Sequence, residues 1–159
     1  MERNQDLAFI EMAVELAVSA VTQNAGGPFG CVIVKNGVVI GRGNNKVLST
    51  HDPTAHAEVV AIRDACQQLG THQLQGCTVY TSCEPCPMCL GAIYWARPDR
   101  IVYACTRQDA ADINFDDDFI YKEILMPVDE REIPAEQCGR EKGLEAFKLW
   151  ANKADKIGY

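Results

Sequence analysis

Two short segments of this chain carry side chains that could bind and use a metal ion. The first is His56-Ala57-Glu58 and the second is Pro85-Cys86-Pro87-Met88-Cys89. One imidazole and two thiolates would give zinc three protein ligands, which leaves the fourth position of a tetrahedral ion open for water. A carboxylate beside such an ion can take a proton from that water and pass it on. The predicted ligands are therefore His56, Cys86 and Cys89, and Glu58 is the predicted proton carrier.

The cysteine pair requires a helix that begins at Cys86. Cys86 and Cys89 are three residues apart, so both sulfurs lie on one side of a helix. Pro87 favours the first turn of that helix, and the positive helix N-terminus favours thiolates. Cys83 shares the same spacing, but Pro85 separates it from the helix, and we interpret Cys83 as a neighbour of the site. The alternatives are two buried free cysteines or a redox pair, and neither explains the histidine and glutamate.

The histidine must stand at the opening of its helix. His56 and Glu58 are two residues apart, and on a regular helix such side chains point roughly 200° apart. Both can face one ion only if His56 lies where its direction is less constrained, with Thr54 as a candidate N-cap. His51 and His72 have no such setting and are expected to face solvent. Read alone, the histidine would be a core or surface residue and Glu58 a surface acid.

Elements around these segments alternate between helix and strand. Spacing of apolar residues predicts helices over 6–24, 55–69, 87–96, 119–124 and 144–153, and strands over 29–34, 38–45, 77–82 and 100–105, with a hairpin turn at 35–37. Residues 109–118 are expected to be turns and 126–134 an extended exposed segment. Strand, helix and strand in succession predict a mixed sheet, antiparallel at its first hairpin and parallel afterwards, with helices on its faces.

Composition limits the classes of protein. The 159 residues, 47% of them hydrophobic, fit one compact domain. A net charge of −7 is a poor match for nucleic acid phosphates or anionic membranes. The eight cysteines are not preceded by a signal peptide, and no apolar run of about 18 residues is present, so we expect a cytoplasmic protein with reduced cysteines.

The combination H-x-E…P-C-x-x-C is the signature of zinc-dependent nucleobase deaminases. Over almost its full length the chain resembles the cytidine deaminase superfamily and, within it, the small bacterial guanine deaminases. The resemblance is carried by 27–30, 44–45, 52–58, 81–97, 115–117 and 119–123. It implies a three-layer α/β/α fold with a mixed five-stranded sheet between helices, and a single deaminase domain over residues 1–159.

The same resemblance implies hydrolysis of guanine to xanthine and ammonia with one Zn²⁺ per chain. Water activated by the ion would attack the carbon that bears the amino group, and Glu58 would move the protons. Asp117 is similar to the family's second acid, with Asp116 as its substitute. Taken without the resemblance, residues 116–118 are a solvated acidic turn.

Further residues resemble the family's substrate contacts. Asn45 matches a residue that hydrogen-bonds the purine, and an amide can both donate to and accept from a base edge. Phe29, Ala57 and Trp95 resemble residues of the pocket, although core packing equally explains the aromatic rings. Tyr159 resembles a residue that reaches the pocket of a neighbouring subunit.

The resemblance implies a homodimer whose C-terminal segment, about residues 126–159, swaps onto the partner. That exchange would give a docking surface to the apolar side of the last helix, which carries Leu144, Phe147 and Trp150.

Three rival functions remain from the sequence. A tRNA adenosine deaminase shares both motifs but should carry a basic surface, unlike this chain. A deaminase of another small aminated ring, such as cytosine or an aminated triazine, would use the same site. A binding module stabilised by zinc would normally supply four protein ligands, and only three are evident.

Overall fold

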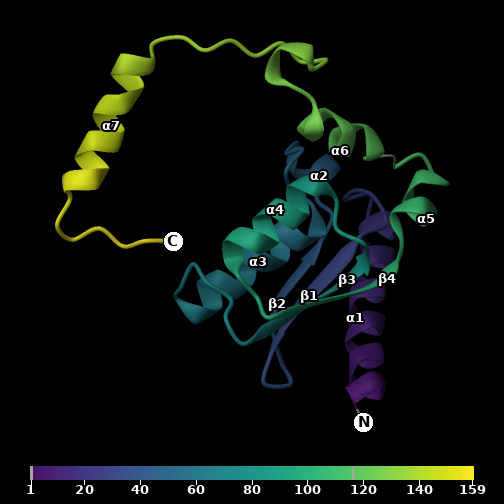
Figure 1. Cartoon of the computed structure of the whole chain (residues 1–159). Coiled ribbons are helices and arrows are strands. Elements are labelled where there is room, and N and C mark those ends of the chain that lie inside the picture. Colours follow the sequence, from purple (N-terminus) through teal and green to yellow (C-terminus); the bar gives the residue numbers. More distant parts are fainter. Residues whose placement is uncertain (1, 116) are drawn as a thin grey trace. The chain divides into compact units, whose positions relative to one another are not determined.

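The computed structural model describes residues 2–115 and 117–159. The chain forms two compact units, Met1–Asp117 and Asp118–Tyr159. In the first unit a sheet has the order β2-β1-β3-β4, with β1 Gly30–Lys35, β2 Val38–Asn44, β3 Cys77–Cys83 and β4 Arg100–Cys105 (Figure 1). Pairs β1–β2 and β1–β3 are antiparallel and β3–β4 is parallel, which confirms the predicted mixed sheet.

Helices cover both faces of this sheet and make the three predicted layers. Helix α1 (Glu2–Thr22) lies on one face, and α3 (Ala57–Leu69) and α4 (Pro87–Ala96) lie on the other (Figure 1). Alternation along the strands divides the core accordingly. Cys31, Ile33 and Val79 pack with α3 and α4, whereas Val32, Val34 and Tyr80 pack with Phe9 of α1.

Two glycines allow the helices to lie directly on the strands. A Cβ at Gly43 of β2 would lie 2.2 Å from the carbonyl oxygen of Ala57, in the first turn of α3. A Cβ at Gly30 of β1 would lie 2.0 Å from the carbonyl oxygen of Ala13 in α1. Because only a glycine tolerates such approaches, Gly43 sets how closely the opening of α3 meets the sheet.

The hairpin between β1 and β2 turns at Asn36 and Gly37, whose φ angles are 51° and 77°. Two consecutive positive φ angles are typical of the tight hairpin turn that an Asn-Gly pair predicts. Two short helices were not predicted from the sequence, α2 (Val47–Thr50) and α5 (Arg107–Ala111). Among the described helices, none has the length and apolar character needed to cross a membrane.

The expected fifth strand is wrong for the described residues, whose sheet has four strands. After β4, Thr106 accepts a hydrogen bond from the backbone of Asp109 and the Asp109 side chain accepts one from the backbone of Thr106, and this capping box starts α5 instead of a strand. The predicted extended segment, 126–134, contains the 3₁₀ helix η1 (Val128–Glu130). The segment 126–134 also contains Pro127 and Pro134, which lack the backbone N–H that pairing with a neighbouring strand needs.

The second unit holds α6 (Asp118–Leu125), η1 and α7 (Arg140–Asn152). Large apolar side chains of α7 are exposed in the single chain, and they include Phe147, Leu149 and Trp150. A helix with such a face is normally covered by another element or another molecule.

Candidate metal centre

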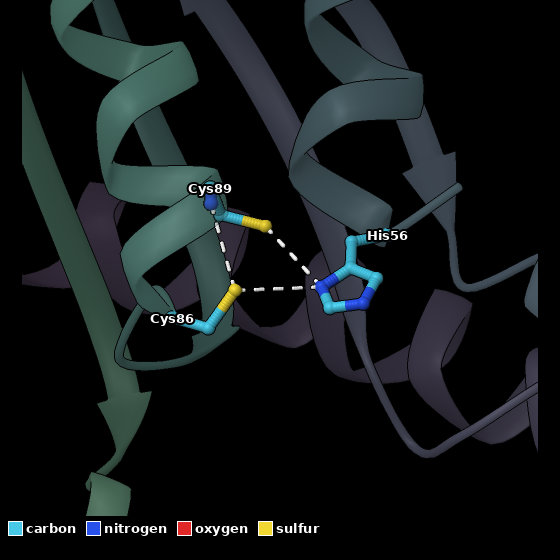
Figure 2. A group of neighbouring side chains, drawn as sticks. All are labelled: His56, Cys86 and Cys89. Atoms are coloured by element: carbon cyan, nitrogen blue, oxygen red, sulfur yellow. Dashed lines mark hydrogen bonds between the residues drawn. The ribbon is translucent and has the colours of Figure 1, made fainter. Parts of the chain in front are cut away.

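His56, Cys86 and Cys89 point toward one another between the openings of α3 and α4 (Figure 2). The Nδ1 atom of His56 lies 3.5 Å from each cysteine sulfur. All three donor atoms lie within 4.8 Å of one another. Bonds of about 2.0–2.3 Å at tetrahedral angles separate two donors of a zinc ion by roughly 3.5 Å. The donor set and its spacing therefore fit zinc.

Two of the predicted ligands, His56 and Cys86, are N-cap residues of helices, as the ligand spacing requires. His56 is the N-cap of α3, with φ −69° and ψ 156°, so its ring does not follow the helical direction of Glu58. Cys86 is the N-cap of α4, and its sulfur accepts a hydrogen bond from the backbone N–H of Cys89 at 3.5 Å. The suggestion that Thr54 caps α3 is wrong. Both its N–H and its hydroxyl donate to the Asp52 carboxylate, two residues earlier.

The pKa values of the three predicted ligands are shifted in different directions. Hydrogen bonding with Cys89, together with the neighbouring His56, lowers the pKa of Cys86 to about 4. The same bond, together with burial, raises the pKa of Cys89. Hydrogen bonding to Cys86 raises the pKa of His56. Cys86 is therefore the more readily ionised of the two thiols, and metal binding requires both to lose their protons.

Glu58 lies in the first turn of α3 with only 6% of its surface exposed. Burial raises the pKa of its carboxyl, opposed by hydrogen bonds from its own backbone N–H, from Cys89 and from Thr81. The Thr81 hydroxyl donates to Oε1 at 3.0 Å. A carboxyl whose pKa moves toward neutrality is suited to accept and return a proton. Thr81 was not singled out from the sequence, although alternation along β3 places it on the face that carries Val79.

Cys83 lies apart from the group of donors. Its thiol donates to the carbonyl oxygen of Thr106 at 3.4 Å, and burial raises its pKa to about 11. It does not belong to the His56, Cys86 and Cys89 group. Its placement agrees with the interpretation of Cys83 as a neighbour.

Asn45 and Phe29 are linked by a backbone hydrogen bond. The backbone N–H of Asn45 donates to the carbonyl oxygen of Phe29 at 3.0 Å, and Oδ1 of Asn45 accepts from the N–H of Val47 at 3.1 Å. The ring of Phe29 meets Phe115 edge to face, with centroids 5.0 Å apart. Phe115 is a further aromatic side chain next to a predicted pocket residue, and its sequence signal was the stretch 115–117, which ends at Asp117.

The remaining predicted residues differ in their settings. Asp117 is half-buried, and its charge contributes to the raised pKa of His56. The side chain of Ala57 is fully buried in the core, so only its backbone could contact a ligand. Trp95 on α4 is 64% exposed and Tyr159 in the second unit is 67% exposed. Asp116 lies outside the described residues.

The two remaining histidines, His51 and His72, are exposed, as expected.

Comparisons with known proteins match both the zinc site and the length of the chain. The family model described as the cytidine and deoxycytidylate deaminase zinc-binding region matches residues 3–105. Guanine deaminase from Bacillus subtilis is 56% identical over 151 residues, which are 95% of this chain and 97% of that protein. The X-ray structure of guanine deaminase from Bacillus subtilis has a TM-score of 0.93 and 55% identity, and the match covers 96% of this chain and 97% of that one.

A more distant relative is the tRNA-specific adenosine deaminase of Bacillus subtilis, 38% identical over 99 residues. That match covers 62% of this chain and 61% of that protein. Similarity to the guanine deaminase thus continues into the second unit, beyond the zinc-binding region.

Proposed function

Because this chain belongs to the cytidine and deoxycytidylate deaminase family, we propose that it hydrolyses guanine to xanthine and ammonia. The observation that carries the proposal is 56% identity to a guanine deaminase across 95% of the chain. The close approach of His56, Cys86 and Cys89 beside the buried Glu58 supports it. Free guanine also suits a chain of net charge −7 better than tRNA, whose phosphates such a surface repels.

Zinc held by His56, Cys86 and Cys89 would supply a Lewis acid that makes water nucleophilic near neutral pH. Glu58 would take one proton of the water and deliver it to the ring nitrogen beside the attacked carbon. The second proton would leave with the amino group. A C–O bond forms and a C–N bond breaks, so guanine and water become xanthine and ammonia. Asp117 would assist the proton transfer from the side of the substrate.

The substrate would be held by residues around the zinc-binding side chains. Since Oδ1 of Asn45 accepts from the backbone of Val47, its amide nitrogen would donate to the purine. Phe29 and Trp95 would contact the flat ring, and Ala57 would act through its backbone. Tyr159 would reach the pocket of the neighbouring subunit.

One assay tests the substrate. Purified protein with quantified zinc is given guanine, an anticodon stem-loop containing adenosine, cytosine and an aminated triazine in parallel, and ammonia is measured. We expect strong release from guanine and little from the RNA. Release from the RNA alone would assign the chain to tRNA editing, and equal or faster turnover of cytosine would overturn the choice of guanine.

We also propose a cytoplasmic homodimer in which residues 126–159 exchange between subunits. The exposed apolar residues of α7, and the division of the chain at Asp118, support such an exchange. All eight cysteines are free thiols, which suits a reducing compartment.

Subunit exchange predicts complementation between two defective variants. We expect low deaminase activity from Glu58→Gln and from a variant that lacks Tyr159 when each is assayed alone. After they are unfolded together and refolded, activity should return, because one site of each mixed dimer would combine an intact Glu58 with an intact Tyr159. The measurement is ammonia release against each variant refolded alone. If the mixture shows only the average of the two variants, each chain completes its own site.

A further inference from the structure

The side chain of Thr81, with its hydroxyl group, is buried against the sheet. None of its surface is exposed, and it lies on β3 opposite Cys31 of β1. Alternation along β3 directs it to the same face as Val79, which packs against α3 and α4. A buried hydroxyl in such a layer is unfavourable unless it is hydrogen-bonded, so its partner indicates why a threonine stands here.

The hydroxyl of Thr81 has two acceptors within reach. Oε1 of Glu58 lies 3.0 Å away, and the carbonyl oxygen of Gly30 lies 3.5 Å away. A hydroxyl has only one hydrogen to donate. The carboxyl oxygen is the nearer of the two acceptors, and its distance lies within the usual range for an O–H···O hydrogen bond, whereas 3.5 Å is at the limit. Thr81 therefore donates to Glu58.

The backbone behind Thr81 is itself held in place. The N–H of Gly30 donates to the hydroxyl of Ser82, the next residue of β3, at 3.0 Å. Gly30 has no room for a side chain because α1 lies against it. Thr81 thus presents its hydroxyl from a rigid strand, and a donor fixed in this way can fix what it binds.

We propose that Thr81 is a positioning residue that holds Oε1 of Glu58 and so fixes the orientation of the carboxyl group for proton transfer. The two oxygens of a carboxylate are chemically equivalent until one accepts a fixed hydrogen bond. The backbone N–H of Glu58 and the side chain of Cys89 also hydrogen-bond this carboxyl group, and Thr81 adds a donor fixed in the sheet at Oε1, which restricts rotation of the group. Small misplacements of a catalytic group can lower a rate by about 100-fold, so such orientation matters for turnover. The inference rests on the proposed role of Glu58 as proton carrier.

Thr81→Val tests the role because it keeps the shape of the side chain and removes only the donor. We expect kcat for guanine to fall about 10- to 100-fold, with KM within about threefold and one zinc per chain retained. The solvent deuterium isotope effect on kcat should rise, because proton transfer becomes slower than the other steps. Thr81→Ser restores the hydroxyl and should recover kcat to within about threefold.

Thr78→Val is the matched control, since it removes the same hydroxyl from the same strand. Thr78 interacts with Tyr80, whose ring packs on the α1 face of the sheet, away from Glu58. Its kcat and isotope effect should equal those of the wild type. A Thr81→Val enzyme with wild-type kcat would overturn the proposal. So would a loss that Thr81→Ser fails to recover, which would indicate a purely structural role.

A crystal structure of the zinc-loaded Thr81→Val protein gives a readout that needs no activity. We expect the Glu58 carboxylate to rotate or to occupy two orientations. A carboxylate unchanged from the wild type overturns the proposal, whichever ring the enzyme deaminates. If Thr81→Val does not fold, the same comparison is made with Thr81→Ala. The wild-type assay judges the proposed reaction separately, because it does not involve the variant.

Discussion

Glu58→Gln should lower kcat for guanine by about 10²- to 10⁴-fold while the protein keeps its fold and one zinc per chain. Glutamine has the shape of glutamate, and its carbonyl oxygen can still accept the hydrogen bond from Thr81. An amide, however, cannot take a proton from water and return it to a ring nitrogen. The measurement is ammonia release at saturating guanine, with the metal content and melting temperature of the same preparation.

Glu11→Gln is the control for this substitution, because Glu11 is an exposed acid on α1. It loses the same charge without touching the site, and wild-type turnover is expected. If Glu58→Gln also turned over guanine at the wild-type rate, Glu58 would not be the proton carrier. A purely structural zinc site in a binding module would then explain the three ligands better.

Replacing Cys86 should abolish both zinc binding and turnover. Cys86 is one of three donor side chains and also caps α4, where its sulfur accepts from the N–H of Cys89. A serine can keep the cap but is a poor zinc ligand, whereas an alanine loses both functions. We therefore expect Cys86→Ser and Cys86→Ala to lose the ion equally. The alanine variant should be less stable than the serine variant by about 0.5–2 kcal/mol.

Zinc per chain and the free energy of unfolding in urea separate these two effects. Cys83→Ser is the control, since the Cys83 thiol donates a hydrogen bond to the carbonyl oxygen of Thr106 and is not one of the three predicted zinc ligands. It should retain one zinc per chain. Loss of zinc from Cys83→Ser, with retention in Cys86→Ser, would mean that the cysteine ligands were assigned wrongly.

Local chemistry made most of the metal site predictable. The two-residue spacing of His56 and Glu58 is incompatible with one face of a helix, and the structure resolves the conflict by making His56 the N-cap. The predicted helix over 87–96 has the observed bounds of α4, because Pro87 opens it and residue 97 ends it in a left-handed conformation. In each segment one predicted ligand, His56 or Cys86, is also the N-cap of a helix, so the same residue indicates both the ligand and the start of the helix.

Other features depend on contacts that sequence periodicity does not encode. Helix α2 has four residues, too few for an apolar repeat. Helix α5 has only five residues, although Thr106 and Asp109 form a capping box that the sequence did display. The role of Thr81 depends on its distance to Glu58, 23 residues earlier in the chain, and only the folded sheet sets that distance.

The position of the ligands along the chain has a further consequence for the unfolded state. His56 and Cys86 are 30 residues apart. An ion that stays bound at both positions when the protein unfolds closes the intervening chain into a loop and so restricts the conformations open to the unfolded protein. For a loop of that size, the chain-entropy model gives a stabilisation of about 3–4 kcal/mol, comparable to that of a disulfide. The three predicted ligands would thus act as a reversible cross-link in addition to holding the ion for catalysis.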